Sequence, residues 1–379
     1  MNVLVLGAGL VGAPMARDLA ADRDFAVTVV DRDPAALERL AARAPVATRV
    51  QDLADPAEVT ALAAGFDIVV SAVPGFLGYR TLKAVIETGR NVVDIAFFPE
   101  DPFALDGLAR DRGVTAVVDC GVFPGMGSVL VMHAAQRLER VDSVLVHVGG
   151  LPRIRTWPWE YKAVFSPIDV IEEYTRPARY LENGLAVVRP ALSDPELVDV
   201  PGVGTLEAFN TDGLRTLVRT IGAPHMKEKT LRYPGHVEKM RLLRECGFFG
   251  EEPIDVSGAQ VRPIDLTARL LFPMWQLGPG EGDLTVMQIR VAGTVGGRHR
   301  VHVFELLDHF DEALGVTSMA RTTGYTATLA LRMVAQGLYA DKGVSPPEYL
   351  GRDPRCVDFL LAGLAARGVH YRERIEDVP

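Results

Sequence analysis

The sequence predicts an α/β protein that opens with a doubly wound parallel sheet and continues into an α+β part. Three observations favour this fold class. Short apolar segments alternate with amphipathic ones over the first 120 residues, the apolar segments are rich in Val and Ile, and a glycine-rich turn follows the first of them. Strand–helix alternation of this kind indicates βαβ units, whose right-handed crossovers produce a doubly wound sheet.

The first part divides into six expected strands and five expected helices. The strands are 2–6, 26–31, 46–50, 67–73, 91–95 and 114–119. The helices are 13–21, 34–42, 56–64, 77–88 and 101–111. The strands lack polar alternation, which is typical of a parallel sheet covered by helices on both faces.

After Gly121 the pattern changes, and the segments expected there are antiparallel. A helix over 127–138 and a strand over 142–148 lead into a Trp-containing irregular loop at 150–160. Asn183-Gly184 and Gly296-Gly297 each lie between two apolar runs, as in two-residue β-hairpins. The flanking strands are 178–181 with 185–188 and 284–291 with 299–307, and the helices expected later are 213–221, 235–246, 264–271, 317–336 and 355–367. We therefore divide the chain into 1–120, an α+β domain over 121–310, and 311–379.

Composition limits the class of function. The chain has 379 residues, of which 48% are hydrophobic, and a net charge of −9. An acidic chain does not favour nucleic acid or an anionic membrane as partner. Three scattered cysteines and eight histidines form no disulfide framework and no zinc-binding spacing, so no metal is expected. With no apolar run of about 18 residues and no signal peptide, we expect a soluble protein of the cytoplasm.

A glycine motif lies where a dinucleotide would bind. Gly7-Ala8-Gly9-Leu10-Val11-Gly12 follows the first strand directly and precedes the first helix. The first glycine permits the tight turn, the second lets the backbone approach a pyrophosphate, and the third allows close packing of helix and strand. The helix N-terminus then offers free N–H groups to the anion. The sequence thus predicts a Rossmann-like domain, with a glycine-rich turn that binds nothing as the alternative.

Asp31 closes the second strand, 19 positions after Gly12. A carboxylate at this position accepts hydrogen bonds from the adenosine ribose diol and repels a 2′-phosphate, which favours NAD over NADP. Arg32 weakens this preference because an arginine can hold the phosphate.

Two further strand ends are expected at the same edge of the sheet, where ligands collect. One carries the small residues Ser71, Ala72, Val73 and Pro74, against which a cofactor can lie; the alternative is a tight turn. The other ends at Asp94, whose alternative role is to cap a turn.

Seven stretches, in order along nearly the whole chain, carry a resemblance to a known family. They are Val70–Pro74, Asp94-Ile95, Asp119–Met126, Gly149–Pro152, Leu206–Leu214, Thr230–Lys239 and Ser318–Tyr325. They resemble the saccharopine dehydrogenase-like proteins, and among these most closely the L-lysine 6-dehydrogenases.

The resemblance implies a Rossmann domain with an inserted catalytic and dimerisation domain, and C-terminal helices that return to the first domain. It implies a homodimer or larger homo-oligomer that oxidises the side-chain amine of L-lysine with NAD. The products are ammonia and 2-aminoadipate 6-semialdehyde, which cyclises to a piperideine carboxylate. Two alternatives stay open. One is a saccharopine-type enzyme acting on a secondary amine, with Arg153, Arg155, Arg176 and Arg179 as a second anion site; the other is an NAD-binding sensor without turnover.

Amine oxidation needs a proton acceptor and a site for the substrate carboxylate. Arg232, in the Arg-Tyr-Pro-Gly turn that resembles the family's, is our candidate for the carboxylate, a surface arginine being the alternative. His236 is a candidate proton relay because histidine titrates near neutrality, and a solvated residue opening a helix is the alternative. Asp94 is the candidate to orient the amine or act as base.

The remaining candidates line the expected pocket. Cys120 follows the last strand and is either a pocket residue or inert packing, and Phe123, Pro124 and Gly125 are expected to shape the nicotinamide site. Lys162 becomes a base if burial lowers its pKa, and is otherwise an exposed lysine. Three further residues are expected to contact the substrate: Tyr161, Thr322 and Thr323.

Overall fold

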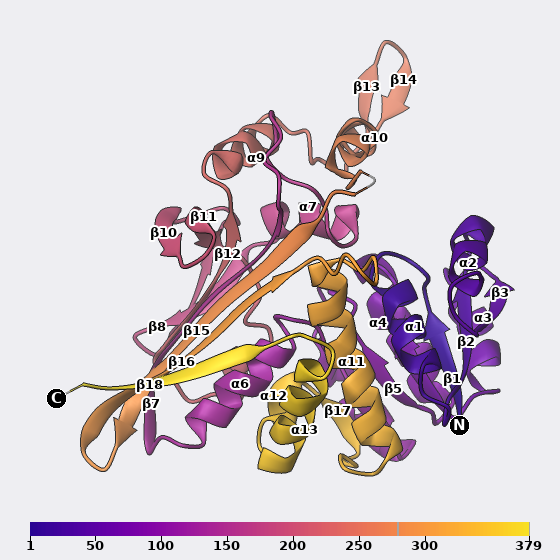
Figure 1. Ribbon diagram of the computed structural model, residues 1–379. Helices are drawn as coiled ribbons and strands as arrows, with labels where there is room; N and C mark the ends of the chain where they lie inside the picture. Colours follow the sequence, from indigo (N-terminus) through magenta and orange to yellow (C-terminus); the bar gives the residue numbers. More distant parts are fainter. Residues whose placement is uncertain (279, 379) are drawn as a thin grey trace. The chain divides into compact units, whose positions relative to one another are not determined.

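The computed structural model describes residues 1–278 and 280–378, with only the backbone of Val378 (Figure 1). Contacts within the chain divide it into two compact units. Unit 1 comprises residues 1–137 and 319–371, and unit 2 comprises residues 138–318 together with the segment from Arg372 on. Each unit is described by itself.

Unit 1 is built on a seven-stranded sheet in the order β17-β6-β5-β4-β1-β2-β3. Every neighbouring pair in it is parallel. The strands are β1 (Asn2–Leu6), β2 (Ala26–Asp31), β3 (Ala47–Val50), β4 (Ile68–Ser71), β5 (Asn91–Asp94), β6 (Thr115–Val117) and β17 (Gly343–Ser345). The doubly wound parallel sheet predicted from the sequence is thus confirmed, and β17 is an addition that the sequence did not indicate.

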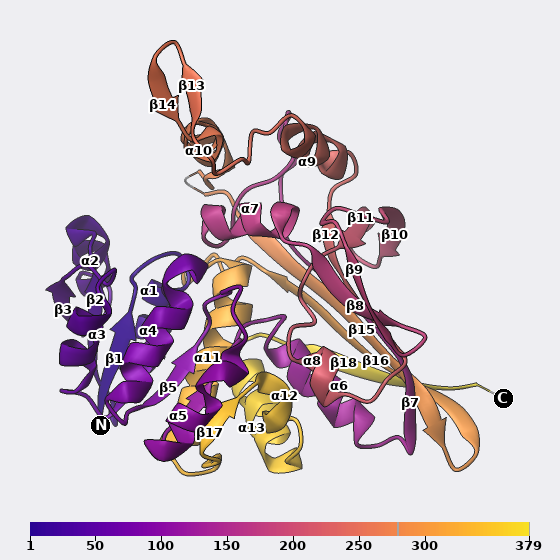
Figure 2. The ribbon, with the colours of Figure 1, turned by 180° about the vertical axis from the view of Figure 1, so that it is seen from behind.

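Helices cover both faces of this sheet, with α1 and α11 in front in Figure 1 and α4 and α5 in front in Figure 2. The helices are α1 (Gly12–Ala20), α2 (Pro34–Ala41), α3 (Pro56–Ala63), α4 (Gly75–Glu87), the 3-10 helix η1 (Pro102–Leu105), α5 (Asp106–Asp111), α6 (Met126–Ala135), α11 (Ser318–Ala335), α12 (Pro347–Leu350) and α13 (Pro354–Ala365). Asp33, Asp55 and Asp353 cap α2, α3 and α13, each just before a proline in the first turn. An acceptor at the N-cap followed by proline is a strong signal for a helix start, which explains why these starts could be predicted.

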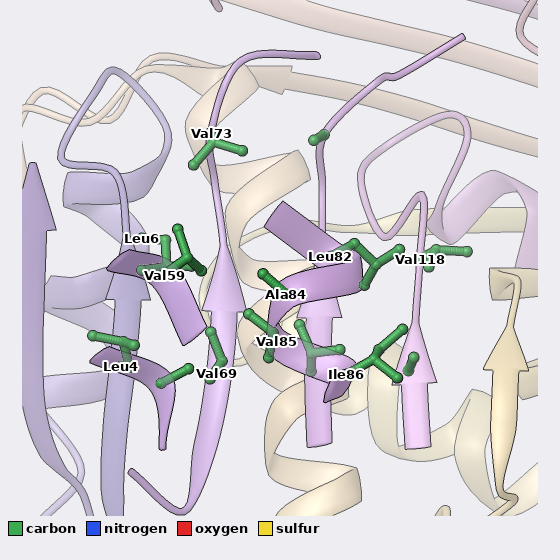
Figure 3. Close-up of a cluster of buried hydrophobic side chains, with 14 of the residues drawn as sticks. Leu4, Leu6, Val59, Val69, Val73, Leu82, Ala84, Val85, Ile86 and Val118 are labelled. Carbon is green, nitrogen blue, oxygen red and sulfur yellow. The ribbon is translucent and has the colours of Figure 1, made fainter. Parts of the chain in front are cut away.

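One core cluster of unit 1 lies between the sheet and α3 and α4 (Figure 3). Leu4, Leu6 and Val69 from the strands pack with Leu82 and Val85 from α4, and all five are fully buried. Burial of each such side chain contributes roughly 1.5–3 kcal/mol to the stability of the folded state. The apolar strand segments of the sequence therefore have the buried positions that their composition indicates.

Unit 2 contains a mixed sheet in the order β10-β11-β12-β7-β15-β16-β18, with β8 paired to β12 and to β9. β12 runs parallel to β7, and β15 runs antiparallel to β7 and to β16. The strands are β7 (Arg140–Pro152), β8 (Ala178–Glu182), β9 (Leu185–Arg189), β10 (Glu196–Val200), β11 (Gly204–Asn210), β12 (His225–Arg232), β15 (Asp283–Val295), β16 (Arg298–His309) and β18 (Tyr371–Val378). A separate hairpin consists of β13 (Ile254–Val256) and β14 (Ala259–Val261), and the helices are α7 (Pro167–Thr175), α8 (Leu217–Thr220), α9 (His236–Glu245) and α10 (Pro263–Trp275).

Both predicted hairpins form. Asn183 and Gly184 have φ of 52° and 76°, and Gly296 and Gly297 have 58° and 73°. Positive φ at both central residues is the property of a type I′ turn. By contrast, the predicted helix over 213–221 is reduced to α8.

β12 was not predicted, because its central residues Lys227, Glu228 and Lys229 are poor strand formers. Pairing with β7 and β11 stabilises this strand in spite of its composition.

The divisions between the units lie elsewhere than the expected boundaries at 120 and 310. α6 belongs to unit 1, so the first division falls after Arg137, and the second falls after Ser318. The last segment contains α12 and α13 in unit 1, but it ends in β18, which joins the sheet of unit 2. No helix in the described part of the chain is long and apolar enough to span a bilayer.

Candidate functional site

The glycine motif forms a tight turn between β1 and α1. The Gly7 N–H donates to the Val30 carbonyl at 2.8 Å, and a Cβ on Gly7 would lie 2.7 Å from the Ala72 carbonyl oxygen. A Cβ on Gly12 would collide with the Gly7 carbonyl. Around Gly9, by contrast, a Cβ would meet no atom within 4 Å. The first and third glycines are therefore required by packing, whereas the second leaves open space beside the turn, as close approach of a ligand demands.

Asp31 lies at the end of β2, beside this turn. Its carboxylate accepts the N–H of Ala8 at 2.6 Å and that of Asp33 at 2.8 Å. The carboxylate thus helps to hold the glycine turn in shape. Arg32 is exposed, and its side chain has no recorded partner in the described part of the chain. Leu10 is exposed in the motif, whereas Val11 is buried.

Three strands end in line at this edge of the sheet. Leu6 is in register with Ser71, and Ser71 is in register with Asp94. Ser71 and Asp94 are fully buried. The Ser71 hydroxyl has no hydrogen-bond partner among the described residues, and Asp94 Oδ2 accepts the Ala96 N–H at 3.2 Å. Ala72 N–H donates to the Leu6 carbonyl, Val73 is buried, and Pro74 precedes α4.

The segment after β6 returns to the same edge, where Cys120 N–H donates to the Asp94 carbonyl at 2.9 Å. Cys120 is fully buried, and burial, together with the nearby Asp94 and Asp119, raises the pKa of its thiol well above the usual range. A thiol that stays protonated fits inert packing rather than a catalytic role. Gly125 has φ of +137° and bridges back to Gly121, so that this tight loop leaves Phe123 and Pro124 half-buried.

The start of α11 packs on both of these turns. A Cβ on Gly121 would lie 3.4 Å from Thr323 Cγ2, and one on Gly324 would lie 2.8 Å from Met15 Cγ in α1. Thr322 is buried and donates to the Met319 carbonyl at 3.4 Å. Unit 1 therefore brings together every residue predicted to bind the cofactor, together with Asp94, Cys120, Thr322 and Thr323.

The edge has the features that a nicotinamide dinucleotide requires. Space beside Gly9 leaves the start of α1 approachable for a pyrophosphate, Asp31 stands where an adenosine ribose binds, and Ser71 offers a buried hydroxyl without a partner. Among the described residues no group of acidic, histidine or cysteine side chains could hold a metal ion.

A second cluster, in unit 2, surrounds Arg232 at the end of β12. Arg232 is 2% exposed, so the alternative of a surface arginine is wrong. Its Nη2 donates to Glu173 of α7 at 2.5 Å, Nε donates to the Tyr174 hydroxyl at 3.3 Å, and Nη1 donates to the Leu231 carbonyl at 3.0 Å. The guanidinium also lies 4.6 Å from the centroid of the Tyr161 ring. Burial lowers the pKa of Arg232, but Tyr174, Tyr161 and Glu173 together outweigh it and raise the pKa, so the residue stays charged.

Several hydrogen-bond donors of this cluster have no acceptor. An arginine has five N–H groups, of which the three bonds above use three and the Tyr161 hydroxyl meets another, so the donors of Arg232 outnumber the acceptors around it. The Trp275 Nε1–H is buried without a partner, the buried Tyr161 O–H has no acceptor, and the two rings meet edge to face with centroids 5.5 Å apart. An unsatisfied buried donor costs about 1–3 kcal/mol, so such a set is typical of a site completed by a ligand with acceptor oxygens.

His236 is part of this cluster and is buried rather than solvated. Its Nδ1 lies 2.9 Å from the Trp159 carbonyl, and its Nε2 lies 2.9 Å from the Tyr174 hydroxyl. Because a carbonyl only accepts, Nδ1 carries the proton and Nε2 accepts from Tyr174. Burial, with the charge of Arg232, lowers the pKa of His236 to about 3. The residue is therefore neutral and fixes Tyr174, and the predicted relay by titration near neutrality is wrong.

Lys162 lies outside this cluster. Its Nζ donates to the Gln276 carbonyl at 3.1 Å and lies 3.6 Å from Glu281. A paired ammonium does not fit the predicted role of a base. Of the two loop tryptophans, Trp157 is 81% exposed, and Trp159 Nε1 donates to Met274 Sδ at 3.5 Å.

Sequence reasoning missed Glu173, Tyr174 and Trp275. Glu173 and Tyr174 lie in α7, a helix that was not predicted, and Trp275 ends α10 four residues beyond its expected end. The local sequence Pro273-Met274-Trp275 does not indicate that the tryptophan is buried beside an arginine, because its position depends on how α10 packs. No signal in the sequence could have found them.

The four arginines weighed as a second anion site are each ion-paired. Arg153 pairs with Glu312, Arg155 with Glu160, Arg176 with Glu172, and Arg179 with Asp212. Close to the last pair lies Glu228, which accepts from Thr211 and Gly213. Its burial outweighs these hydrogen bonds and raises the pKa of Glu228 to about 7.

Two protein-family models together match almost the whole chain. Residues 3–117 match the family model of the saccharopine dehydrogenase NADP binding domain, and residues 121–369 match that of the saccharopine dehydrogenase C-terminal domain. The chain belongs to the saccharopine dehydrogenase family. The family resemblance noted in the sequence is thereby confirmed, and with it a nicotinamide dinucleotide-binding domain.

Several members of the saccharopine dehydrogenase family are similar to the chain over nearly its full length. The L-glutamate-forming, NADP(+) saccharopine dehydrogenase of Saccharomyces cerevisiae is 26% identical and covers 98% of this chain and 99% of its own. The carboxyaminopropylagmatine dehydrogenase of Synechocystis is 23% identical, and the match covers 98% of this chain and 97% of that protein. The alpha-aminoadipic semialdehyde synthase of Bos taurus is 24% identical over 91% of this chain, which spans only 45% of that longer protein.

Solved structures agree on the fold. The L-Glu-forming saccharopine dehydrogenase from Saccharomyces cerevisiae superposes with a TM-score of 0.81 at 21% identity, covering 99% of both chains. The homospermidine synthase of Legionella pneumophila in complex with NAD has a TM-score of 0.69 at 12% identity, covering 98% of this chain and 91% of that one.

Proposed function

We propose that this protein catalyses nicotinamide-dependent oxidation of the side-chain amine of L-lysine, releasing ammonia and 2-aminoadipate 6-semialdehyde. The observation that carries the proposal is the buried, charged Arg232, whose N–H groups outnumber the acceptors around it, beside the Tyr161 O–H and the Trp275 N–H, which have no acceptor. An amino acid presents a carboxylate, and a carboxylate supplies the acceptor oxygens that such donors lack. A bound nicotinamide would supply the hydride acceptor, and a water molecule supplies the aldehyde oxygen as the C–N bond breaks and ammonia leaves.

Within the proposal, the chain's own residues bind, orient and take up a proton. Gly9, Asp31 and Ser71 hold the dinucleotide, and Asp31 favours NAD through the ribose diol. A free lysine amine has a pKa near 10.4 and must lose a proton before oxidation. Asp94, the buried acid at the strand edge, orients the amine and receives this proton. We propose that the reaction takes place in the cytoplasm.

A second candidate is oxidation or formation of a secondary amine. It is favoured by the relatives, whose names include saccharopine dehydrogenase, carboxyaminopropylagmatine dehydrogenase and carboxynorspermidine synthase. A secondary amine with two amino-acid halves needs a second carboxylate site. Arg176 and Arg179 are ion-paired with Glu172 and Asp212, so a second carboxylate there competes with an internal one for the charge of each arginine.

A substrate panel separates the candidates. The purified protein is assayed by NADH absorbance with L-lysine, ornithine, saccharopine, and a lysine analogue without its α-carboxylate. Turnover of lysine that is lost with the analogue supports the proposal. Turnover of saccharopine alone moves the protein to the second candidate, and absence of turnover with every amine, while NAD still binds, leaves the sensor alternative.

The carboxylate site is tested by an electroneutral pair of substitutions. Arg232→Met with Glu173→Gln removes both charges together, because removing Arg232 alone would leave Glu173 buried and unpaired. We expect the KM for the amino acid to rise about 10- to 100-fold, as for the loss of a charged hydrogen bond of about 1.5–3 kcal/mol, with the KM for NAD unchanged. Glu173→Gln alone is the control for the altered partner. A KM for the amino acid equal to that of the unsubstituted protein contradicts the assignment.

A further inference from the structure

Unit 1 has a hollow beside β17, the outermost strand of its sheet (labelled in Figures 1 and 2). Its volume is about 230 Å³, and it is lined from α5, from β17 with the residues before it, and from α12 with the residues after it. A water molecule takes up roughly 30 Å³ in the liquid, so the hollow has room for a small metabolite. Three strands lie between β17 and β1, which places the hollow apart from the glycine turn.

Two cationic side chains that line the hollow have no carboxylate partner among the described residues. Lys342 Nζ donates to the uncharged Thr115 hydroxyl at 3.3 Å. The Arg352 guanidinium lies 3.7 Å from the centroid of the Tyr349 ring, and no acceptor is recorded for its side-chain N–H groups in the described part of the chain. Hydrogen bonds from charged donors to anions are among the strongest in proteins, so both side chains are suited to an anionic ligand.

Two residues with hydroxyl groups line the same hollow. Ser345 is 2% exposed, its Oγ accepts from Tyr339 Oη at 2.8 Å, and no acceptor is recorded for its own O–H among the described residues. The Tyr349 hydroxyl likewise has no recorded hydrogen-bond partner within the described chain. Buried donors ordinarily have acceptors, so a ligand with acceptor oxygens would complete this set.

The charges around the hollow also favour an anion. Arg110 donates to Asp106 at 2.7 Å, so that these two charges cancel. Lys342 and Arg352 remain, opposed among the lining residues by the exposed carboxylate of Asp341, which leaves a net charge of +1. A phosphate group offers three strong acceptor oxygens, whereas a carboxylate offers two. Donors that come both from β17 with the residues before it and from α12 with the residues after it therefore suit a phosphate group better than a carboxylate.

We propose that this hollow binds a phosphate group, carried by a small metabolite or present as the free ion. Lys342 and Arg352 supply the charged hydrogen bonds, and the hydroxyls of Ser345 and Tyr349 supply uncharged ones. Asp341 repels the anion and limits its affinity. The proposal does not depend on which amine the protein oxidises.

The test is calorimetric titration of the full chain with inorganic phosphate and, separately, with glycerol 3-phosphate. Sodium chloride keeps the ionic strength constant, because salt screens exposed charges. Saturable binding is expected. Tighter binding of the ester assigns the site to a phosphorylated metabolite, and binding of inorganic phosphate that is as tight or tighter assigns it to the free ion. Absence of saturable binding by both probes overturns the proposal.

Substitutions locate the bound phosphate. Lys342→Gln and Arg352→Gln should each weaken the binding about tenfold or more through the loss of a charged hydrogen bond. Asp341→Asn should strengthen it by up to about fivefold, because it removes the opposing charge, and a gain of affinity cannot result from misfolding.

The matched control is Arg43→Gln, which removes an exposed positive charge just after α2 and should leave the phosphate affinity unchanged. Affinity that is unchanged in both Lys342→Gln and Arg352→Gln places the anion elsewhere, for example at the glycine turn, and overturns the proposal. An equal loss in Arg43→Gln shows unspecific attraction and overturns it as well.

Discussion

At the scale of single residues, Asp31 has two roles that the sequence shows only in part. Its position at the end of β2 suits a ribose diol, and its carboxylate also holds the Ala8 and Asp33 N–H groups. A variant that removes the side chain would therefore loosen the glycine turn as well as the cofactor. The effect of the negative charge of Asp31 on cofactor binding therefore has to be measured separately from its effect as a hydrogen-bond acceptor in the turn.

Asp31→Asn removes the negative charge and keeps the acceptor for the glycine turn, because the amide oxygen still accepts from Ala8, although the amide NH2 then replaces the acceptor of the Asp33 N–H. We expect NAD to bind about tenfold or more weakly, and NADP to gain relative to NAD because Arg32 is free to meet its 2′-phosphate. The dissociation constants of both cofactors, measured by calorimetry, give the ratio. A ratio that does not change rules out the ribose role.

Arg232 and His236 show the limit of reasoning from residue type. Both were predicted as site residues, and both lie in one cluster. Only the structure shows that Arg232 is 2% exposed and that the pKa of His236 falls to about 3. Burial depends on neighbours distant in sequence, here Glu173 and Tyr174 of α7.

At the scale of an element, the β1–α1 turn separates glycines needed for folding from a glycine needed for binding. Gly12→Ala places a methyl group against the Gly7 carbonyl, whereas Gly9→Ala places it in open space. Neither Gly9 nor Gly12 has a positive φ, so backbone strain does not enter the comparison.

We expect Gly12→Ala to lower the melting temperature by several degrees, for a loss of about 1–3 kcal/mol from overpacking. Gly9→Ala should leave the melting temperature within about a degree and still lower NAD affinity about tenfold or more, because its methyl group occupies the space of the pyrophosphate. Thermal unfolding without cofactor, followed by titration with NAD, distinguishes the two effects. Undiminished NAD affinity in Gly9→Ala contradicts dinucleotide binding at this turn.

The elements that escaped prediction share a cause. β12 carries Lys227, Glu228 and Lys229, whose strand propensity is low. It forms because it pairs with β7 on one side and β11 on the other. β17 is three residues long and pairs with β6 from more than 200 positions away. Local patterns cannot report pairings of this kind.

At the scale of the whole molecule, unit 1 is completed by a segment from the far end of the chain. Asp18 of α1 accepts from Arg332 of α11 at 2.8 Å and from Arg367, just after α13, at 2.6 Å, and it also accepts from Thr328. Burial raises the pKa of Asp18, but Arg332, Arg367 and Thr328 outweigh it, and the net shift is downward. The carboxylate therefore stabilises the junction of three helices.

Asp18→Asn should lower the free energy of unfolding by about 3 kcal/mol at neutral pH, since the half-buried Arg367 loses its carboxylate and the buried Arg332 is left with Asp22 at 3.5 Å. A lowered folded-state pKa gives stability that is full above the unfolded pKa, near 3.9, and is lost as the pH falls through the folded value. The difference between the two proteins should thus be constant from about pH 7 to pH 5 and should shrink below about pH 4.

Urea unfolding at each pH measures this difference. Glu245→Gln, which removes an exposed partner of Arg244, is the matched control and should have no measurable effect at any of these pH values. A difference for Asp18→Asn that grows as the pH falls has the wrong sign and rejects the ion-pair explanation.

Patterns in the sequence were sufficient to predict the parallel sheet, the glycine turn, the acid at the end of β2, both hairpins and the family, because each rests on residues close together in the chain or on motifs in a fixed order. Capping residues and apolar runs act locally, so their pattern is legible without a structure. The tertiary structure alone decided which candidates are buried, which are paired, and that Glu173, Tyr174 and Trp275 surround Arg232. It also left the hairpin of β13 and β14 exposed. These properties depend on desolvation and on partners from distant segments, and no local pattern encodes either.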